Sequence, residues 1–118
     1  MIGRATELGV ASYPGAWTAT EVLTAWRAGA TAVKLFPAAT GGPRHLTDLR
    51  GPFPQIPMLP TGGVGIDDIA AYLRAGAVGV GLGSPLLGDA LTSGEVAGVT
   101  DRARRALRAV AAARTEAR

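Results

Sequence analysis

The chain has 118 residues, a length typical of one domain with a substantial core. Hydrophobic residues make up 47% and charged residues 18%, the balance of a globular protein rather than a disordered one. The sequence has no cysteine, which excludes disulfides and thiolate chemistry, and its single histidine argues against a metal site built on histidines. We therefore expect chemistry that needs neither a metal nor a cofactor.

The formal net charge of +3 does not indicate nucleic-acid binding. Six of the eleven arginines are expected on one face of the last helix, at the spacing of a solvated surface, and no aromatic residues interleave with them. These are Arg102, Arg104, Arg105, Arg108, Arg114 and Arg118. No apolar stretch approaches the roughly 20 residues of a membrane span, and the first residues do not resemble a secretory signal. We expect a cytoplasmic protein that binds neither nucleic acid nor membrane.

The sequence runs four times from a short apolar strand, through a glycine or proline turn, into an amphipathic helix. The predicted strands span about 9–13, 31–36, 56–59 and 78–82. The predicted helices span about 18–27, 43–49, 67–74 and 100–114, and a loop covers 86–98. The first of these helices has the clearest start, because Thr18 and Glu21 have the spacing of a capping box.

Strands that alternate with helices of about ten residues predict parallel βαβ units with right-handed crossovers. Four such units are half of a (β/α)8 TIM barrel, or a small open parallel sheet. The barrel is favoured because the distinctive residues lie at or just past the carboxyl ends of predicted strands, where barrel enzymes place their sites. We expect residues 1–118 to be a single partial domain of the α/β class, a half barrel with the last four β/α units.

The only lysine, Lys34, lies inside an apolar run that ends at Pro37. Strand alternation puts Val33 and Leu35 on a face that can pack under helices, and puts Lys34 and Phe36 on the face toward the barrel mouth. Lysine, unlike arginine, can lose its proton in an apolar site and form an imine. Two interpretations stay open: a Schiff-base lysine, or a strand-end lysine whose stem packs while its ammonium reaches water.

Glycine turns follow the third and fourth predicted strands. Gly62 and Gly63 put no side chain between a phosphate and the backbone, and Gly83 does the same beside the hydroxyl of Ser84. Barrel loops in these positions often bind phosphate. A glycine pair alone more often just permits a turn, but two such turns on consecutive strand ends, next to the strand of the only lysine, favour a phosphate site.

Longer motifs carry a family resemblance. The chain resembles the 2-dehydro-3-deoxy-6-phosphogluconate/4-hydroxy-2-oxoglutarate (KDPG/KHG) aldolase family in VKLFPA, LRGPFPQIPMLPTGGV and AGAVGVGLGSPLL, and in ELGV and YPGAWTATE near the start. The resemblance implies a class I aldolase, a carbon–carbon lyase on a (β/α)8 barrel that needs no cofactor. Its substrate would be a keto-acid phosphosugar cleaved to pyruvate and glyceraldehyde 3-phosphate, or 4-hydroxy-2-oxoglutarate cleaved to pyruvate and glyoxylate. A homo-oligomer, specifically a trimer, is also implied.

By that resemblance Lys34 is the Schiff-base lysine, and Phe36 stacks near the bound keto acid. The residues that match the phosphate-binding part of the pattern are Thr61, Gly62, Gly63 and Ser84. The GLGS form of the last turn also resembles the 6-phosphogalactonate branch, which leaves the sugar epimer open.

The aldolase reaction also needs a general acid/base, and the sequence offers none. Its carboxylates are better explained on helices and loops: Glu21, Asp67, Asp68, Asp89 and Glu95. The family's glutamate base, and the arginine and threonine that hold the pyruvate carboxylate, come from its first four strands, which this sequence lacks. The chain is expected to be the carboxyl-terminal half of an aldolase, inactive without the other half.

Two other functions remain open. The chain could be a truncated, non-catalytic phosphosugar-binding or assembly module that keeps the remnants of the site. A different barrel enzyme that binds phosphate is disfavoured, because it gives Lys34 no task. Among the remaining residues His45 is expected on the surface and Trp26 in the core, while Trp17 either borders the site mouth or packs.

Overall fold

The fold was determined from a computed structural model that describes residues 1–116. Its elements in chain order are α1 (Ile2–Glu7), β1 (Gly15–Ala16), α2 (Ala19–Arg27), β2 (Val33–Leu35), α3 (Ala38–Arg50), β3 (Met58–Pro60), the 3-10 helix η1 (Ile66–Asp68), α4 (Ile69–Arg74), α5 (Ser84–Leu87), α6 (Ala90–Ser93) and α7 (Ala97–Glu116). Arg118, expected on the basic face of the last helix, lies outside the described residues. None of the helices in residues 1–116 has the length and hydropathy to cross a membrane.

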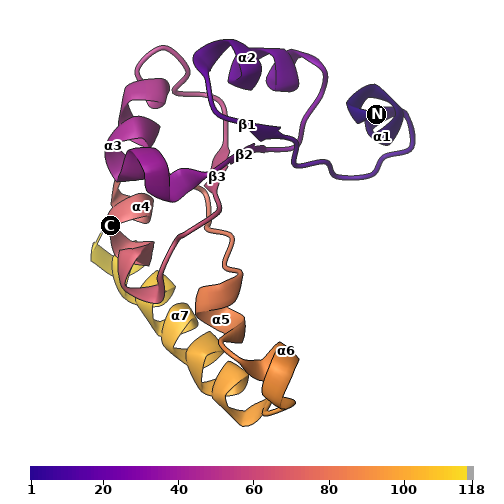
Figure 1. Ribbon diagram of the computed structural model, residues 1–118. Helices are drawn as coiled ribbons and strands as arrows, with labels where there is room; N and C mark the ends of the chain where they lie inside the picture. The colour runs from indigo at the N-terminus through magenta and orange to yellow at the C-terminus, as the bar shows by residue number, and fades with distance from the viewer. Residues whose placement is uncertain (117–118) are drawn as a thin grey trace.

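The three strands form one parallel sheet in the order β1-β2-β3, as the βαβ pattern predicts (Figure 1). Lys34 on the central strand pairs with Gly15 of β1 on one side and with Leu59 of β3 on the other. A single parallel bridge between Thr61 and Gly81 continues the pairing beyond β3. The class is therefore α/β with a small parallel sheet.

One face of this sheet is the centre of the hydrophobic core. Val33, Leu35 and Met58 are completely buried there, whereas Lys34 and Leu59, which alternate with them, are only half-buried. Helices α2 and α3 contact the strands and complete this core. Burying each large side chain stabilises the fold by roughly 1.5–3 kcal/mol. The predicted division between a helix-covered face and a face that carries Lys34 is confirmed.

The start of α2 confirms the capping box. The backbone N–H of Glu21 donates to the Thr18 hydroxyl at 3.3 Å, and the Glu21 carboxylate accepts from the N–H groups of Thr18 at 2.8 Å and Trp17 at 2.9 Å. These hydrogen bonds, the one from the Thr18 backbone foremost, hold the pKa of Glu21 below its usual value. Glu21 therefore fixes the turn that joins β1 to α2.

The first predicted strand, 9–13, is wrong. Pairing begins later, because the Lys34 N–H bonds to the carbonyl of Pro14 and the Phe36 N–H bonds to that of Ala16. Val10 and Tyr13, whose apolar character suggested a strand, are both more than half exposed, at 59% and 54%. Proline has no N–H to donate, but its carbonyl can accept a hydrogen bond at the start of a strand. Pro14 therefore precedes β1 instead of following the first strand.

The fourth predicted strand, 78–82, forms only the bridge at Gly81. The N–H groups of Val78 and Gly81 donate to Met58 and Pro60 at 3.1 and 2.8 Å, so the segment does lie beside β3. Alternating glycines in this segment provide few side chains for packing, which weakens a strand. The predicted loop 86–98 is also wrong in part, because it contains the end of α5 and all of α6.

Helix α3 begins earlier than predicted. The predicted helix, 43–49, is its second part, and the residues predicted as a glycine-rich turn form its first turn from Ala38. Gly42 separates the two parts with a φ of 63° and a ψ of −169°, a conformation that glycine adopts without the steric cost of a Cβ. Pro43 then opens the second part, a position that tolerates proline because no N–H is needed there.

Candidate active site

Lys34 lies on the central strand, with its side chain on the face of the sheet that is not buried under helices. Its Nζ lies 4.7 Å from the centroid of the Phe36 ring, a distance that permits a cation–π interaction. None of the ion pairs within residues 1–116 involves Lys34. A Cβ added to its neighbour Gly15 would meet nothing within 4 Å, so there is open space beside the lysine. A small ligand has room to approach Lys34 from this side.

The turn after β3 is bonded directly to the end of β2. The Thr61 N–H donates to the carbonyl of Leu35 at 2.9 Å, next to Lys34. In return, the N–H groups of Ala38 and Ala39, at the start of α3, donate to the carbonyls of Thr61 and Gly62 at 2.8 and 3.0 Å. The structure thus brings the Lys34 strand end and the predicted phosphate turn together.

Gly62 and Gly63 each have a structural reason to be glycine. Their φ values are 92° and 72°, in the region that disfavours a side chain. A Cβ on Gly62 would lie 2.6 Å from Cε2 of Phe36, and one on Gly63 would lie 2.5 Å from Cβ of Ala39. The Phe36 ring therefore packs over Gly62 while remaining 48% exposed. These glycines shape the turn whether or not it holds a phosphate.

Gly83 and Ser84 are exposed at the start of α5, two residues after the bridge that joins Gly81 to Thr61. A Cβ on Gly83 would meet nothing within 4 Å, so the backbone here is open to a ligand. Within residues 1–116, no backbone hydrogen bond is donated by the N–H of Gly62, Gly63 or Gly83. N–H groups without partners in turns are suited to binding an anion.

The prediction for His45 is wrong. Its ring stacks on that of Trp17, with the centroids 4.1 Å apart, and its Nε2 lies 2.9 Å from the Trp17 carbonyl. A carbonyl only accepts, so Nε2 carries the hydrogen. Gly41 makes room for this pair, because a Cβ there would be 2.5 Å from Cβ of His45. Trp17 therefore packs between α3 and the β1 turn, and Trp26 packs against the core as predicted.

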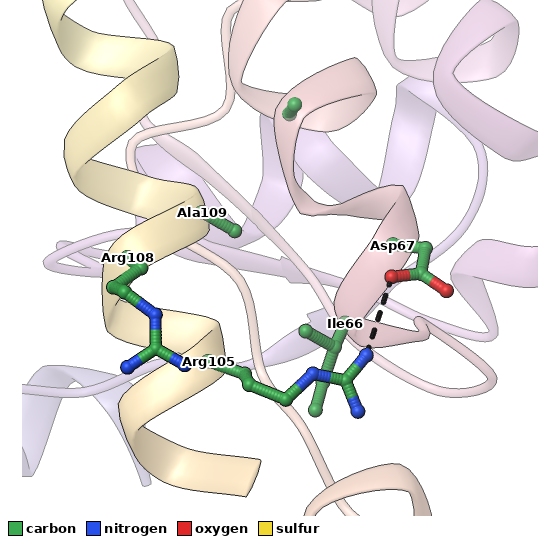
Figure 2. A pocket seen from close by; sticks show the side chains of 6 residues that line it. Ile66, Asp67, Arg105, Arg108 and Ala109 are labelled. Atoms are coloured by element: carbon green, nitrogen blue, oxygen red, sulfur yellow. Dashed lines mark ion pairs between the residues drawn. The ribbon is translucent and has the colours of Figure 1, made fainter.

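Three carboxylates at the starts of helices have structural partners, as the sequence predicts. Besides Glu21, the Asp68 carboxylate accepts from the Gly65 N–H at 2.9 Å, and Asp67 lies 3.6 Å from Arg105 of α7 (Figure 2). The described residues contain no cluster of histidine and acidic side chains that could hold a metal ion.

An open cleft of about 430 Å³ lies between the start of α4 and helix α7 (Figure 2). It is lined by Ile66, Asp67, Ala70, Arg105, Arg108 and Ala109. None of these residues belongs to the group formed by Lys34 and the glycine turns. The cleft is therefore a separate feature of the surface, and we place the candidate active site at the strand ends on chemical grounds.

Tyr72 of α4 is a contributor that sequence reasoning missed. Its hydroxyl donates to the carbonyl of Ala38 at 3.1 Å, and the residue is 2% exposed. Burial, with a smaller contribution from the charge of Asp68, raises the pKa of this phenol above its usual value. Its spacing three residues after Ile69 predicts a buried position, but only the fold shows that it holds the chain segment following Lys34.

The fold is that of an α/β protein, with a lysine on the central strand of a parallel sheet and a glycine turn bonded to the end of that strand. The chain matches the family model for KDPG and KHG aldolase over residues 1–113. It belongs to this aldolase family.

Individual relatives agree with the family. The chain is 41% identical over 87 residues to the 2-dehydro-3-deoxy-6-phosphogalactonate aldolase of Escherichia coli, a match that covers 73% of this chain and 42% of the relative. It is 48% identical over 61 residues to the 2-dehydro-3-deoxy-phosphogluconate aldolase of Pseudomonas aeruginosa, covering 51% and 28%. A solved native KDPGal structure superposes with a TM-score of 0.89 at 34% identity, covering 97% of this chain and 54% of that one. The chain thus spans about half the length of the relatives it matches, or less.

Proposed function

We propose that this chain carries the Schiff-base and phosphate-binding part of a class I aldolase, with Lys34 as the residue that forms an imine with pyruvate. The observation that carries the proposal is the position of Lys34: on the central strand, without an acidic partner in the described residues, beside the open backbone of Gly15 and within 4.7 Å of the Phe36 ring. The membership of the chain in the KDPG and KHG aldolase family supports the same assignment.

The chemistry proceeds through atoms that this arrangement can supply. The unprotonated Nζ of Lys34 adds to the C2 carbonyl of the keto acid, and water leaves as the imine forms. The protonated imine accepts the electron pair of the C3–C4 bond as that bond breaks, which leaves an enamine. Protonation of the enamine at C3 and hydrolysis then release pyruvate and restore the lysine. These reaction steps also need a separate group to take the proton of the C4 hydroxyl.

The phosphate of the substrate is assigned to the two glycine turns. The backbone N–H groups of Gly62, Gly63 and Gly83, which donate to no other backbone group in residues 1–116, would point at the anion with the hydroxyl of Ser84. Thr61 holds the first turn against the end of β2. The proposed site therefore binds the keto acid at Lys34 and the phosphate at the turns.

We further propose that the three strands, the segment 78–82 beside β3 and the helices that follow them form half of a (β/α)8 barrel. Three features support this: the sheet is covered by helices on one face, β1 pairs on one side only, and the match to the KDPGal structure covers 54% of that chain. The proton-transfer group and the carboxylate-binding groups would come from the other half. Aldol cleavage would then need both halves, and a trimeric assembly and a cytoplasmic location stay predictions.

The substrate is proposed from the relatives. The family name points to 2-dehydro-3-deoxy-6-phosphogluconate and 4-hydroxy-2-oxoglutarate. The 6-phosphogalactonate epimer is a specific second candidate, because the relative from Escherichia coli with 41% identity is named for it and the sequence has the GLGS turn. A non-catalytic phosphosugar-binding module is the alternative if no imine forms.

Borohydride trapping tests the proposal. The chain is incubated with pyruvate, reduced and analysed by peptide mass spectrometry. We expect one reduced pyruvate adduct on Lys34, and no adduct in Lys34→Arg, which keeps the charge but cannot form an imine. A folded wild-type chain that stays unmodified would leave only the non-catalytic alternative.

A further inference from the structure

Helix α5, which begins at Ser84, is too short and too exposed to fix its own orientation. It is four residues long, and none of its residues is buried. A helix this short is not stable by itself, because it does not offset the cost of nucleation. Contacts from elsewhere in the chain must therefore fix the orientation of α5 and of the Gly83–Ser84 turn.

Arg102 of α7 supplies such contacts. Its Nε donates to the carbonyl of Leu86 at 2.6 Å, and its Nη2 donates to the carbonyl of Leu87 at 2.7 Å. The residue is half-buried, and none of the ion pairs in residues 1–116 involves it. The guanidinium charge is thus placed at the carboxyl end of α5, where a cation is favourable, and its planar fork fixes two carbonyls at once.

The same two leucines hold Gly83. The N–H groups of Leu86 and Leu87 donate to the Gly83 carbonyl at 2.9 and 3.1 Å. Arg102 holds these residues by their carbonyls, and they in turn hold Gly83 by their amides. The carbonyl of Leu86 and the N–H of Leu87 belong to one peptide unit, so a single peptide unit connects the guanidinium to the Gly83 carbonyl.

Two glycines make room for the guanidinium. A Cβ on Gly88, where φ is 57°, would lie 2.8 Å from Nη2 of Arg102, and a Cβ on Gly98 would lie 2.9 Å from Nη1. Gly98 is the second residue of α7, in its first turn. The space that Arg102 occupies gives a reason for glycine at this helical position.

Helix α7 also contacts the segment that follows the other glycine turn. Arg105 reaches Asp67 of η1, as Figure 2 shows, and Ala106 is buried. The exposed ion pair contributes little to stability, so α7 is held against η1 and α4 mainly by packing. Helix α7 therefore contacts the elements that follow both glycine turns: η1 and α4 after Gly62–Gly63, and α5 after Gly83–Ser84.

We propose that Arg102 is a positioning residue for the phosphate half of the site: it sets the orientation of α5 and thereby the direction of the Gly83 N–H and the Ser84 hydroxyl. It does not contact the imine half at Lys34. The inference rests on the proposed phosphate assignment, and it predicts that phosphate binding and imine formation respond differently to changes at Arg102.

The experiment compares Arg102→Gln with Arg104→Gln, a matched control on the same helix that removes one charge from an exposed arginine paired with Asp101. Binding of glyceraldehyde 3-phosphate and of inorganic phosphate is measured by calorimetry at fixed ionic strength, and borohydride trapping of pyruvate is measured in parallel. We expect Arg102→Gln to weaken phosphate binding about tenfold, because two charged hydrogen bonds are lost, with trapping at Lys34 unchanged. Arg104→Gln is expected to leave both unchanged.

Two further variants separate position from charge and from folding. Arg102→Lys keeps the charge without the fork, so it should recover only part of the binding. Gly98→Ala favours the helix and keeps the charge, but it displaces the guanidinium, so it should weaken phosphate binding in a chain that is at least as helical by circular dichroism. Full recovery in Arg102→Lys, or wild-type binding in Gly98→Ala, would overturn the positioning role.

The remaining outcomes are also decisive. Equal losses of phosphate binding and of pyruvate trapping in Arg102→Gln would show a general structural role and overturn the inference. Normal phosphate binding in Arg102→Gln would overturn it while the imine assignment stands. If the wild-type chain traps pyruvate but binds neither phosphate probe, the phosphate assignment and this inference both fall, and the Lys34 assignment remains.

Discussion

The two glycine turns at the carboxyl edge of the sheet are held by different kinds of contact. The turn at Gly62 and Gly63 is bonded through the backbone to β2 and α3, and it is followed by Val64, which is 1% exposed. The turn at Gly83 and Ser84 is exposed and continues into a helix with no buried residue. The first turn is thus part of the core, whereas the second depends on polar contacts from α7.

The more firmly held turn is the one bonded to β2, the strand that carries Lys34. A lysine that forms a covalent bond must be placed accurately, and Lys34 is flanked on its strand by two completely buried residues. A phosphate is bound by several N–H groups that can each adjust slightly. We therefore expect changes near the first turn to affect folding and binding together, and changes near the second to affect binding alone.

The largest effect is expected from the core under Lys34. Leu35→Ala removes a completely buried side chain and should lower the free energy of unfolding by about 2–5 kcal/mol. Leu87→Ala, in the exposed region of α5, should cost much less, because Leu87 is only partly buried. Urea denaturation of both variants measures the difference. Similar losses would mean that α5 is held as firmly as the sheet.

The two glycines of the turns provide a second, smaller contrast. Gly62→Ala places a Cβ at a φ of 92° and 2.6 Å from the Phe36 ring, so it should destabilise the fold by roughly 1–3 kcal/mol and weaken phosphate binding. Gly83→Ala meets nothing within 4 Å and should leave the melting temperature almost unchanged while it weakens phosphate binding by blocking the backbone. Thermal denaturation and calorimetry would separate them, and equal melting temperatures would contradict the contrast.

Tyr72→Phe tests the link from α4 to the segment after Lys34. It removes the hydroxyl that donates to the Ala38 carbonyl and leaves that carbonyl without this partner, which should cost about 1 kcal/mol of stability. The raised pKa of Tyr72 means that its contribution is fully present below the pKa of an unfolded tyrosine. The contribution is lost as the pH rises through the folded pKa. The wild type should therefore lose more stability than Tyr72→Phe above about pH 10, measured by urea denaturation.

The smallest effect is expected at Glu21, which is exposed. Because hydrogen bonds lower its pKa in the folded state, its contribution is present above the unfolded pKa and is lost as the pH falls through the folded value. Glu21→Gln should lower the melting temperature slightly at neutral pH, and the difference from wild type should shrink in acid. A difference that stays constant from neutral pH to pH 3 would contradict this role of the capping box.

The sequence predicts the features that depend on local pattern. The capping box at Thr18 and Glu21, the alternation around Lys34 and the parallel order of the strands all follow from spacing and periodicity. The first strand is misplaced because Val10 and Tyr13 are apolar but exposed, and local pattern does not report what covers a residue.

The errors at His45 and Arg102 have a common physical origin. His45 stacks on Trp17, a residue 28 positions away, in space left by Gly41. The sequence pattern predicts that Arg102 is solvated like its neighbours, but its guanidinium binds carbonyls of α5. Both contacts join elements distant in sequence, and such pairs leave no periodic signal. The prediction for Lys34 rests on the local motif around it and stays a prediction.

The central proposal is that these 118 residues carry the imine-forming lysine and the phosphate-binding turns of an aldolase, and that aldol cleavage also needs a half barrel that supplies the proton-transfer group. It is tested by size-exclusion chromatography with an assay of glyceraldehyde 3-phosphate release on each fraction, using 2-dehydro-3-deoxy-6-phosphogluconate. We expect the chain alone to elute as an assembly and to release no aldehyde, since the free edge of β1 favours association. Co-expression with the amino-terminal half of a family member should restore release. A stable monomer that releases aldehyde by itself would contradict the account.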